Sequence, residues 1–206
     1  ILNHSTMKYN FHKIKPNSLD INFIENKSNI FIKNLEIASH VANDIFNDSN
    51  FPNLNGDLLI NCLESFKMPP GRGEIFSLNK FKIIDDSYNA NPESVKAALD
   101  HLSGFTENRK FFVFGDMKEL GANEEILHKK VGQYAVGKTD ILLTVGKLAK
   151  NAQSNSNNFA LSLHFNDNFS LLEKLNELLT DGDIVLIKGS RSMQLDQLIN
   201  ELKNVK

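Results

Sequence analysis

Short apolar runs alternate with helical patterns from residue 81 to the end of this 206-residue chain, and this alternation restricts the fold more than any other feature. Each run has the length of a buried strand and is followed by apolar residues three or four positions apart, the spacing of one helix face. The runs are Phe81–Ile84, Phe111–Phe114, Ile141–Val145, Ala160–Leu163 and Ile184–Ile187. Strands and helices in this order form right-handed βαβ units. We therefore predict an α/β, Rossmann-like, mostly parallel sheet with helices on both faces.

A proline- and glycine-rich segment, Met68–Gly73, divides the chain. Paired prolines exclude a helix and glycines permit unusual dihedrals, so we predict domains at residues 1–70 and 71–206. The first domain has one clear helical pattern, Leu35–Phe46, and a second predicted helix at Asp57–Phe66. It has too little periodic apolar sequence for an independent core, and the chain has no initiator Met. We expect it to be the end of a domain that begins upstream.

Composition excludes several classes of protein. The net charge of −2 lacks the basic excess that a general nucleic-acid binder needs. The single cysteine, Cys62, excludes an internal disulfide and fits a reducing compartment. No apolar run approaches the roughly 20 residues that cross a bilayer. We therefore expect no nucleic-acid partner and no membrane span.

Ligands of parallel sheets bind at the carboxyl ends of the strands, which directs attention to the loops there. The first loop is Asp85–Pro92. Asn91 and Pro92 have the residue types of an N-cap and a first helical position, so this part reads as an ordinary capped turn. That interpretation leaves the adjacent carboxylates of Asp85 and Asp86 unexplained, because like charges repel unless a cation, a hydroxyl-rich ligand or a basic group meets them. We interpret the whole run as functional.

Two further loops follow later strands. Alone, Gly115–Gly121 reads as a turn with solvated charges. Lys188–Ser192 offers cations, hydroxyls and N–H groups at a helix start, which suits a phosphate or a carboxylate. An N-cap by Ser192 with exposed basic residues explains that loop equally well. His128 is expected to be a surface or half-buried residue of the second helix, and no G-x-G-x-x-G motif follows any strand.

Taken together, these loops resemble the MurF branch of the Mur ligases. The matching residues, in order, are Gly71-Arg72, Asp85–Pro92, Gly115-Asp116-Met117, Glu119-Leu120-Gly121, His128 and Lys188-Gly189-Ser190-Arg191. The D-D-S-Y-N-A-N-P run is specific to that branch. The resemblance covers residues 71–206, and a weaker one places residues 1–70 at the C-terminal end of the family's central ATP-binding domain. The family's phosphate-binding loop and its N-terminal UDP-binding domain have no counterpart in this sequence.

The resemblance implies an ATP-dependent amide-bond ligase of peptidoglycan precursor synthesis. Its substrates would be UDP-N-acetylmuramoyl-tripeptide and D-alanyl-D-alanine, with ATP and Mg²⁺ as cofactors and the Mg²⁺ ligands mainly outside this chain. ATP would phosphorylate a carboxylate of the first substrate, and the amine of the second would attack the acyl phosphate. We expect a cytoplasmic monomer, of which this chain is the C-terminal half and is inactive alone.

The same resemblance assigns residues to the nucleotide. Arg72 matches the linker arginine that reaches the γ-phosphate, and Asp86 matches the aspartate that meets the nucleotide near its ribose, so both are expected to act in catalysis. Asn89 and Asn91 would line the same nucleotide-facing surface. Asn34 matches a helix asparagine near the adenine. We expect none of these residues to bind a metal ion.

A second group of residues is assigned to the substrates. Gly189, Ser190 and Arg191 resemble the pocket for the D-alanyl-D-alanine end, where a free carboxylate would meet a helix N-terminus. Lys188 would assist there as a point charge. Tyr88 lies beside the nucleotide-facing residues and is expected to contact substrate.

Two alternatives stay open at this point. One is a related amide ligase with another amine donor, such as a folylpolyglutamate or cyanophycin synthetase, although the D-D-S-Y-N-A-N-P run argues against it. The other is a non-catalytic binding module. Its support is the absence of the family's His-Asn pair before the helix that starts near Asn34, because Ile30 and Phe31 occupy those positions.

Overall fold

The chain divides into two compact units, residues 1–67 and 68–206. The computed structural model describes residues 68–78, 81–106 and 109–204, together with 34, 37, 38, 41 and 65. Those five residues of the first unit are helical, and the rest of the two helices predicted there lies outside the described residues. The second unit carries the candidate site.

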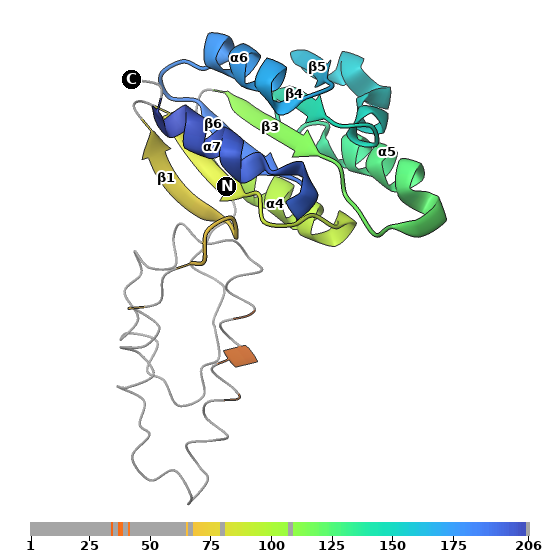
Figure 1. Ribbon diagram of the computed structural model, residues 1–206, viewed down its shortest axis with the longest axis horizontal. Helices are drawn as coiled ribbons and strands as arrows, with labels where there is room; N and C mark the ends of the chain where they lie inside the picture. The colour runs from red at the N-terminus through yellow and green to blue at the C-terminus, as the bar shows by residue number, and fades with distance from the viewer. Residues whose placement is uncertain are drawn as a thin grey trace, which may run out of the picture. The chain divides into compact units, whose positions relative to one another are not determined.

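The second unit is built on a six-stranded sheet with the order β1-β2-β6-β3-β4-β5 (Figure 1). Its strands are β1 (Glu74–Leu78), β2 (Phe81–Asp86), β3 (Lys110–Gly115), β4 (Ile141–Val145), β5 (Leu161–Phe165) and β6 (Ile184–Lys188). All neighbours pair in parallel except β1, which is antiparallel to β2. The predicted α/β sheet is therefore confirmed. The edge strand β1 is new, because its short, half-exposed sequence next to the linker lacks the continuous apolar character of a buried strand.

Helices cover both faces of this sheet. They are α4 (Pro92–Ser103), α5 (Glu124–Ala135), α6 (Asn168–Leu178) and α7 (Leu195–Asn204), with 3-10 segments η3 (Gly121–Asn123), η4 (Ala149–Asn158) and η5 (Arg191–Met193). One core joins α4, α5 and η4 to strand residues such as Phe112 and Leu186. The other joins α6 and α7 to their neighbours Phe111 and Val185. Successive strand residues thus point to opposite faces and both are buried, which explains the continuous apolar runs.

The strand order brings three loops together. Strand β6 lies between β2 and β3 and is parallel to both. The loops that follow β2, β3 and β6 therefore leave the same carboxyl edge side by side, although they are far apart in the sequence. None of the described helices is long and apolar enough to cross a membrane.

An ion pair with a buried carboxylate and a partly exposed guanidinium lies at the opposite edge of the sheet. The guanidinium of Arg109 donates from Nε and Nη2 to the two carboxylate oxygens of Asp183, at 3.0 and 2.7 Å. Asp183 is fully buried, and its carboxylate also accepts the backbone N–H of Thr180 at 2.7 Å. This bidentate contact ties the start of β3 to the start of β6, two of the three strands whose loops contribute to the candidate site.

We expect Gly132→Ala to destabilise the domain by about 1–3 kcal/mol, the usual cost of overpacking. A Cβ on Gly132, in α5, would lie 1.9 Å from the backbone oxygen of Ala152 in η4. Urea unfolding followed by circular dichroism measures the change. The matched control is Gly104→Ala, where φ is −75° and the nearest atom would be 3.4 Å away. Equal stability of the two variants would contradict this packing.

Candidate functional site

Asp85 is turned into the domain and is satisfied there. It is buried, and its Oδ1 accepts hydrogen bonds from the backbone N–H and the hydroxyl of Ser87, at 3.1 and 2.6 Å. Its backbone oxygen accepts the N–H of Gly73 at 2.7 Å. This short side chain closes the turn at the end of β2, as Asp commonly does.

Asp86 points the other way and meets a cation of the protein itself. Its Oδ2 lies 2.6 Å from Nζ of Lys188, which sits beside it in the β2–β6 register. The Lys188 ammonium also donates to the backbone oxygen of Asn89 at 2.9 Å. The Lys188 side chain is 2% exposed and that of Asp86 is 23% exposed. The two adjacent carboxylates therefore have different partners in the protein, Ser87 for Asp85 and Lys188 for Asp86.

Burial of this pair opposes both charges. It raises the pKa of Asp86 above its ordinary value, while the nearby Lys188 and Arg72 charges act in the opposite direction. It lowers the pKa of Lys188, against the attraction of Asp86. Each partner therefore depends on the other to stay charged.

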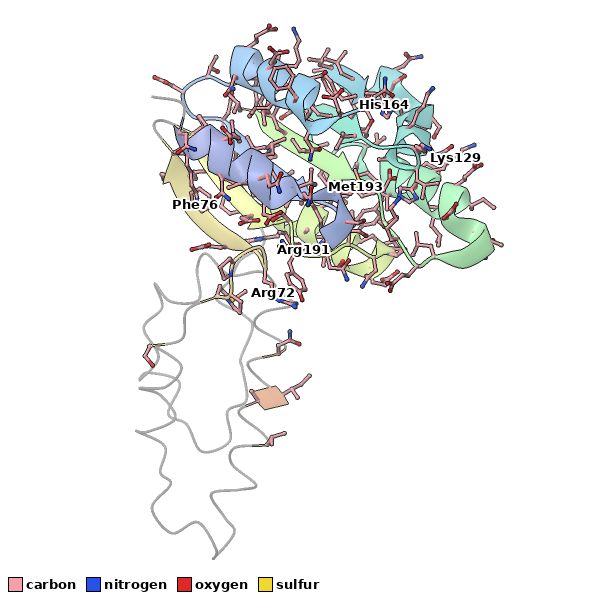
Figure 2. The ribbon with its side chains drawn as sticks, in the orientation of Figure 1. Arg72, Phe76, Lys129, His164, Arg191 and Met193 are labelled. Carbon is pink, nitrogen blue, oxygen red and sulfur yellow. The ribbon has the colours of Figure 1, made fainter. Side chains whose placement is uncertain are left out.

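Arg72 and Tyr88 lie next to the pair. The guanidinium of Arg72 sits over the Tyr88 ring, 4.0 Å from its centroid, as a cation–π contact. Both residues are exposed, and Figure 2 marks Arg72. The Tyr88 backbone N–H donates to the oxygen of Gly71 at 3.0 Å. Gly71 has a φ of +75°, and a Cβ there would be 3.0 Å from that nitrogen, so glycine is needed at this approach.

Asn91 is the N-cap of α4, as predicted, and Pro92 is its first residue. The Asn91 side chain accepts the N–H of Ser94 at 2.8 Å, and the Ser94 hydroxyl accepts the N–H of Asn91 at 3.1 Å. This capping box fixes the start of the helix. Asn89 accepts the N–H of Ala90 through its side-chain oxygen at 2.8 Å. Asn89 and Asn91 are both exposed.

Asp116 corrects the interpretation of the second loop. Of the charges of Gly115–Gly121 that are expected to be solvated, Lys118 and Glu119 are exposed, but Asp116 is 2% exposed. Its Oδ1 accepts the backbone N–H groups of Leu148 and Ala149 at 2.9 and 2.8 Å. Its Oδ2 lies 2.9 Å from Nζ of Lys118. Asp116 therefore caps the segment that follows β4 and joins it to the loop that follows β3.

His128 is a second correction, because it is fully buried rather than on or near the surface. Its Nδ1 lies 2.6 Å from the backbone oxygen of Glu124, which can only accept, so this nitrogen carries the proton. Its Nε2 accepts the N–H of Met117 at 2.8 Å. Burial lowers the pKa of His128. The neutral ring thus anchors the loop after β3.

The loop after β6 is held by the same network. The N–H of Ser190 donates to the backbone oxygen of Asp116 at 2.9 Å, and the Ser190 hydroxyl accepts the N–H of Lys118 at 2.8 Å. Gly189 packs so closely that an added Cβ would be 3.1 Å from Cα of Gly115. Arg191 is exposed (Figure 2) and lies 2.9 Å from the carboxylate of Asp196.

The helix start expected at Ser192 is displaced. Ser192 lies within η5, and α7 begins only at Leu195. Ser192 is therefore not the N-cap, because Gln194, with a left-handed φ of 52°, separates the two helical segments. The N–H groups of the long helix do not open directly onto Lys188–Arg191.

Of the residues predicted for the site, Asn89, Asn91 and Arg191 are exposed after the ends of β2 and β6. Arg72, Asp86, Tyr88 and Lys188 converge at the ends of β2 and β6. Ser190 and Gly189 join them to the loop after β3, whereas Asn34 is an exposed helical residue of the other unit. Among the residues that the structure describes, no group of three or more His, Cys, Asp or Glu side chains could hold a metal ion.

Comparison with known proteins identifies relatives of this domain. Residues 71–191 match the family model described as Mur ligase, glutamate ligase domain. The chain is 32% identical over 140 residues to UDP-N-acetylmuramoyl-tripeptide–D-alanyl-D-alanine ligase of Rickettsia prowazekii, a match that covers 67% of this chain and 31% of that protein. The chain thus spans less than a third of the relative's length.

Two solved structures are also similar. MurF from Acinetobacter baumannii superposes with a TM-score of 0.73 at 25% identity, covering 86% of this chain and 38% of that one. MurF ligase from Thermotoga maritima, in complex with ADP, superposes with a TM-score of 0.62 at 28% identity, covering 70% and 33%. Both similarities extend over most of this chain but only a part of the other.

Protonation of His128 should destabilise the domain, because the ring would lose the hydrogen bond from Met117. In the unfolded chain the imidazole binds protons below about pH 6.5, whereas the lowered pKa keeps the buried ring neutral. The neutral ring therefore makes its full contribution to the free energy of unfolding above about pH 6.5. This contribution is lost as the pH falls through the lowered pKa of His128 in the folded protein. Asp116, Glu124 and Lys118 also act on the ring.

Urea unfolding between pH 7.5 and 5 tests this expectation. His128→Gln should show a weaker loss of stability on acidification than the wild type. Lys129→Gln, an exposed change on the same helix, should keep the full loss. Parallel pH profiles for the wild type and His128→Gln would contradict the role given to this histidine.

Proposed function

Since this chain belongs to the Mur ligase family, we propose that it is the C-terminal part of a ligase that joins D-alanyl-D-alanine to UDP-N-acetylmuramoyl-tripeptide in peptidoglycan precursor synthesis. The name of the Rickettsia prowazekii relative supports these substrates. The observation that carries the proposal is the convergence of Arg72, Asp86 and Tyr88 at one edge of the sheet. These residues come from the linker and from the D-D-S-Y-N-A-N-P run, and both belong to the motifs of the MurF branch.

The reaction we propose has two steps. A carboxylate oxygen of the tripeptide attacks the γ-phosphorus of ATP, so that ADP leaves and an acyl phosphate forms. The amine of D-alanyl-D-alanine then attacks the acyl carbon, phosphate leaves, and the nitrogen loses a proton to give the amide. Negative charge moves between phosphate oxygens in both steps, and fixed cations lower the barrier by meeting it.

Arg72 is the cation that this domain offers to the γ-phosphate. Its guanidinium fork matches phosphate oxygens, and its exposed position over Tyr88 leaves it able to turn toward a ligand. A cation–π contact at an exposed site contributes only about 0.5–1 kcal/mol, so a phosphate easily competes for the arginine. We propose that Arg72 exchanges the Tyr88 ring for the phosphate when the nucleotide binds.

Asp86 would accept hydrogen bonds from the ribose, because its carboxylate is held in place and is still partly exposed. Asn89 and Asn91 are exposed on the same loop and would line the nucleotide-facing surface. Asn34 would lie near the adenine. The ADP in the Thermotoga maritima structure supports a nucleotide as ligand of this family. We propose that the ligands of Mg²⁺ lie mainly outside this chain.

The amine donor would bind at the loop after β6. The guanidinium of Arg191 is exposed and suits the free carboxylate of D-alanyl-D-alanine. Gly189 and Ser190 are held rigidly against the loop after β3, and so would shape the pocket and present backbone groups to the dipeptide. The exposed ring of Tyr88 would contact substrate from the loop after β2.

The two parts of the chain would have separate tasks. We propose that residues 1–70 complete the central ATP-binding domain and that residues 71–206 close over the nucleotide held there. Closure would bring the amine to the acyl phosphate and exclude the water that would hydrolyse it. Catalysis would then belong to the assembled cytoplasmic enzyme.

The full-length protein should release phosphate from ATP only when both peptide substrates are present, and mass spectrometry should detect the amide product. D-alanyl-D-alanine should be consumed in preference to glutamate or aspartate in a competition assay. The 206-residue chain alone should not turn over ATP.

Three results would contradict the proposal. A preference for glutamate or aspartate would indicate a related amide ligase with another amine donor. Failure of the full-length protein to bind either ATP or D-alanyl-D-alanine would indicate a non-catalytic module. ATP turnover by the 206-residue chain alone would show that the triphosphate site lies within it.

A further inference from the structure

Lys188 is not placed to bind a substrate carboxylate directly. Its side chain is 2% exposed, whereas that of Arg191, three residues later, is 63% exposed. Two of the three ammonium donors are directed to Asp86 and to the backbone oxygen of Asn89. A ligand could reach this ammonium only after the domain had rearranged.

Both contacts of Lys188 lie on the loop that follows β2. They fix Asp86 and Asn89, which stand on either side of Ser87 and Tyr88. Two further contacts hold the same loop. Ser87 donates hydrogen bonds to the Asp85 carboxylate, and the Tyr88 N–H donates to the backbone oxygen of Gly71. Together with these contacts, the lysine helps to fix the residues that lie between Asp86 and Asn89.

The ammonium also changes what Asp86 can do beside a nucleotide. A lone carboxylate would repel the phosphates of ATP, and this repulsion is poorly screened next to a buried site. Lys188 compensates that charge within 2.6 Å and binds one carboxylate oxygen, while the carboxylate as a whole stays 23% exposed. Such a carboxylate can accept hydrogen bonds from hydroxyl groups without a net negative charge at the site.

We infer that Lys188 is a positioning residue of the nucleotide site, which acts through Asp86 and the Asn89 carbonyl, and is not a ligand of the amine donor. The inference rests on the proposed function and reassigns one residue within it. Within the motif Lys188-Gly189-Ser190-Arg191, Lys188 then positions the loop after β2, whereas Arg191 binds the amine donor.

Steady-state kinetics of the full-length protein test this division. Lys188→Met should raise the KM for ATP about tenfold or more, because a charge-assisted hydrogen bond is lost, and should leave the KM for D-alanyl-D-alanine within about twofold, the scatter of such comparisons. Arg191→Met should show the reverse pattern. Lys174→Met, an exposed change on α6, should alter neither constant. A rise in the KM for D-alanyl-D-alanine with Lys188→Met that equals or exceeds the rise for ATP would overturn the inference.

A second comparison keeps the test valid if Lys188→Met folds poorly. The neutral pair Asp86→Asn with Lys188→Met avoids an unpaired buried charge. If Lys188 is not a ligand of the amine donor, the KM for D-alanyl-D-alanine of the double variant should stay within about twofold of that of Asp86→Asn alone. A rise of about tenfold in the double variant would mean that the lysine binds the amine donor, and would overturn the inference.

The wild-type protein measured alongside separates this inference from the proposed function. Absence of amide product from the wild type contradicts both. An active wild type whose Lys188→Met variant loses only affinity for D-alanyl-D-alanine contradicts the inference alone.

Discussion

The ion pair between Lys188 and Asp86 is the contact on which the candidate site depends. It joins the ends of two adjacent parallel strands, β2 and β6. Lys188 also holds the loop that follows β2, through the Asn89 carbonyl. Taking two charges out of water is costly, and a pair of apolar side chains would hold these strands together at least as well. A buried pair whose acid is still partly exposed is therefore better explained by the placement of that acid than by stability. We therefore regard the pair as the structural centre of the loop that we propose to face the nucleotide.

A second network gives the same edge of the sheet its rigidity. Asp116 collects backbone N–H groups from the segment after β4 and offers its own carbonyl to Ser190. His128 holds Met117 from the neighbouring helix. The hydrogen bonds from Ala149 to Asp116 and from Met117 to His128 are buried, where a lost partner leaves a desolvated group and costs more than the bond contributes when it is made. These contacts hold the loops after β3, β4 and β6 together, and the charge stabilisation that we propose would use such a preorganised edge.

Much of this fold could be predicted from local sequence. The five parallel strands and the capped start of α4 follow from apolar runs and from the residue types Asn91-Pro92. Burial at the site could not be predicted, because it depends on partners distant in sequence: Lys188 meets Asp86 across 102 positions, and Asp116 meets Leu148 across 32. A polar run such as G-D-M-K-E-L-G gives no local sign of which carboxylate turns inward. The one sequence signal for the buried position of this loop is His128 on the next helix, because its ring accepts the N–H of Met117.

The family of this chain is established, whereas the roles of its side chains are proposed. The Mur ligase domain is established by the match over residues 71–191, and the roles of its side chains are proposals built on their geometry. The most direct measurement of those roles is a crystal structure of the full-length protein with a non-hydrolysable ATP analogue bound. Our account predicts the Asp86 carboxylate within hydrogen-bonding distance of the ribose, with Lys188 still paired to it and Arg72 turned from Tyr88 toward the phosphates. A nucleotide bound away from the loop after β2, with Asp86 facing solvent, would contradict it.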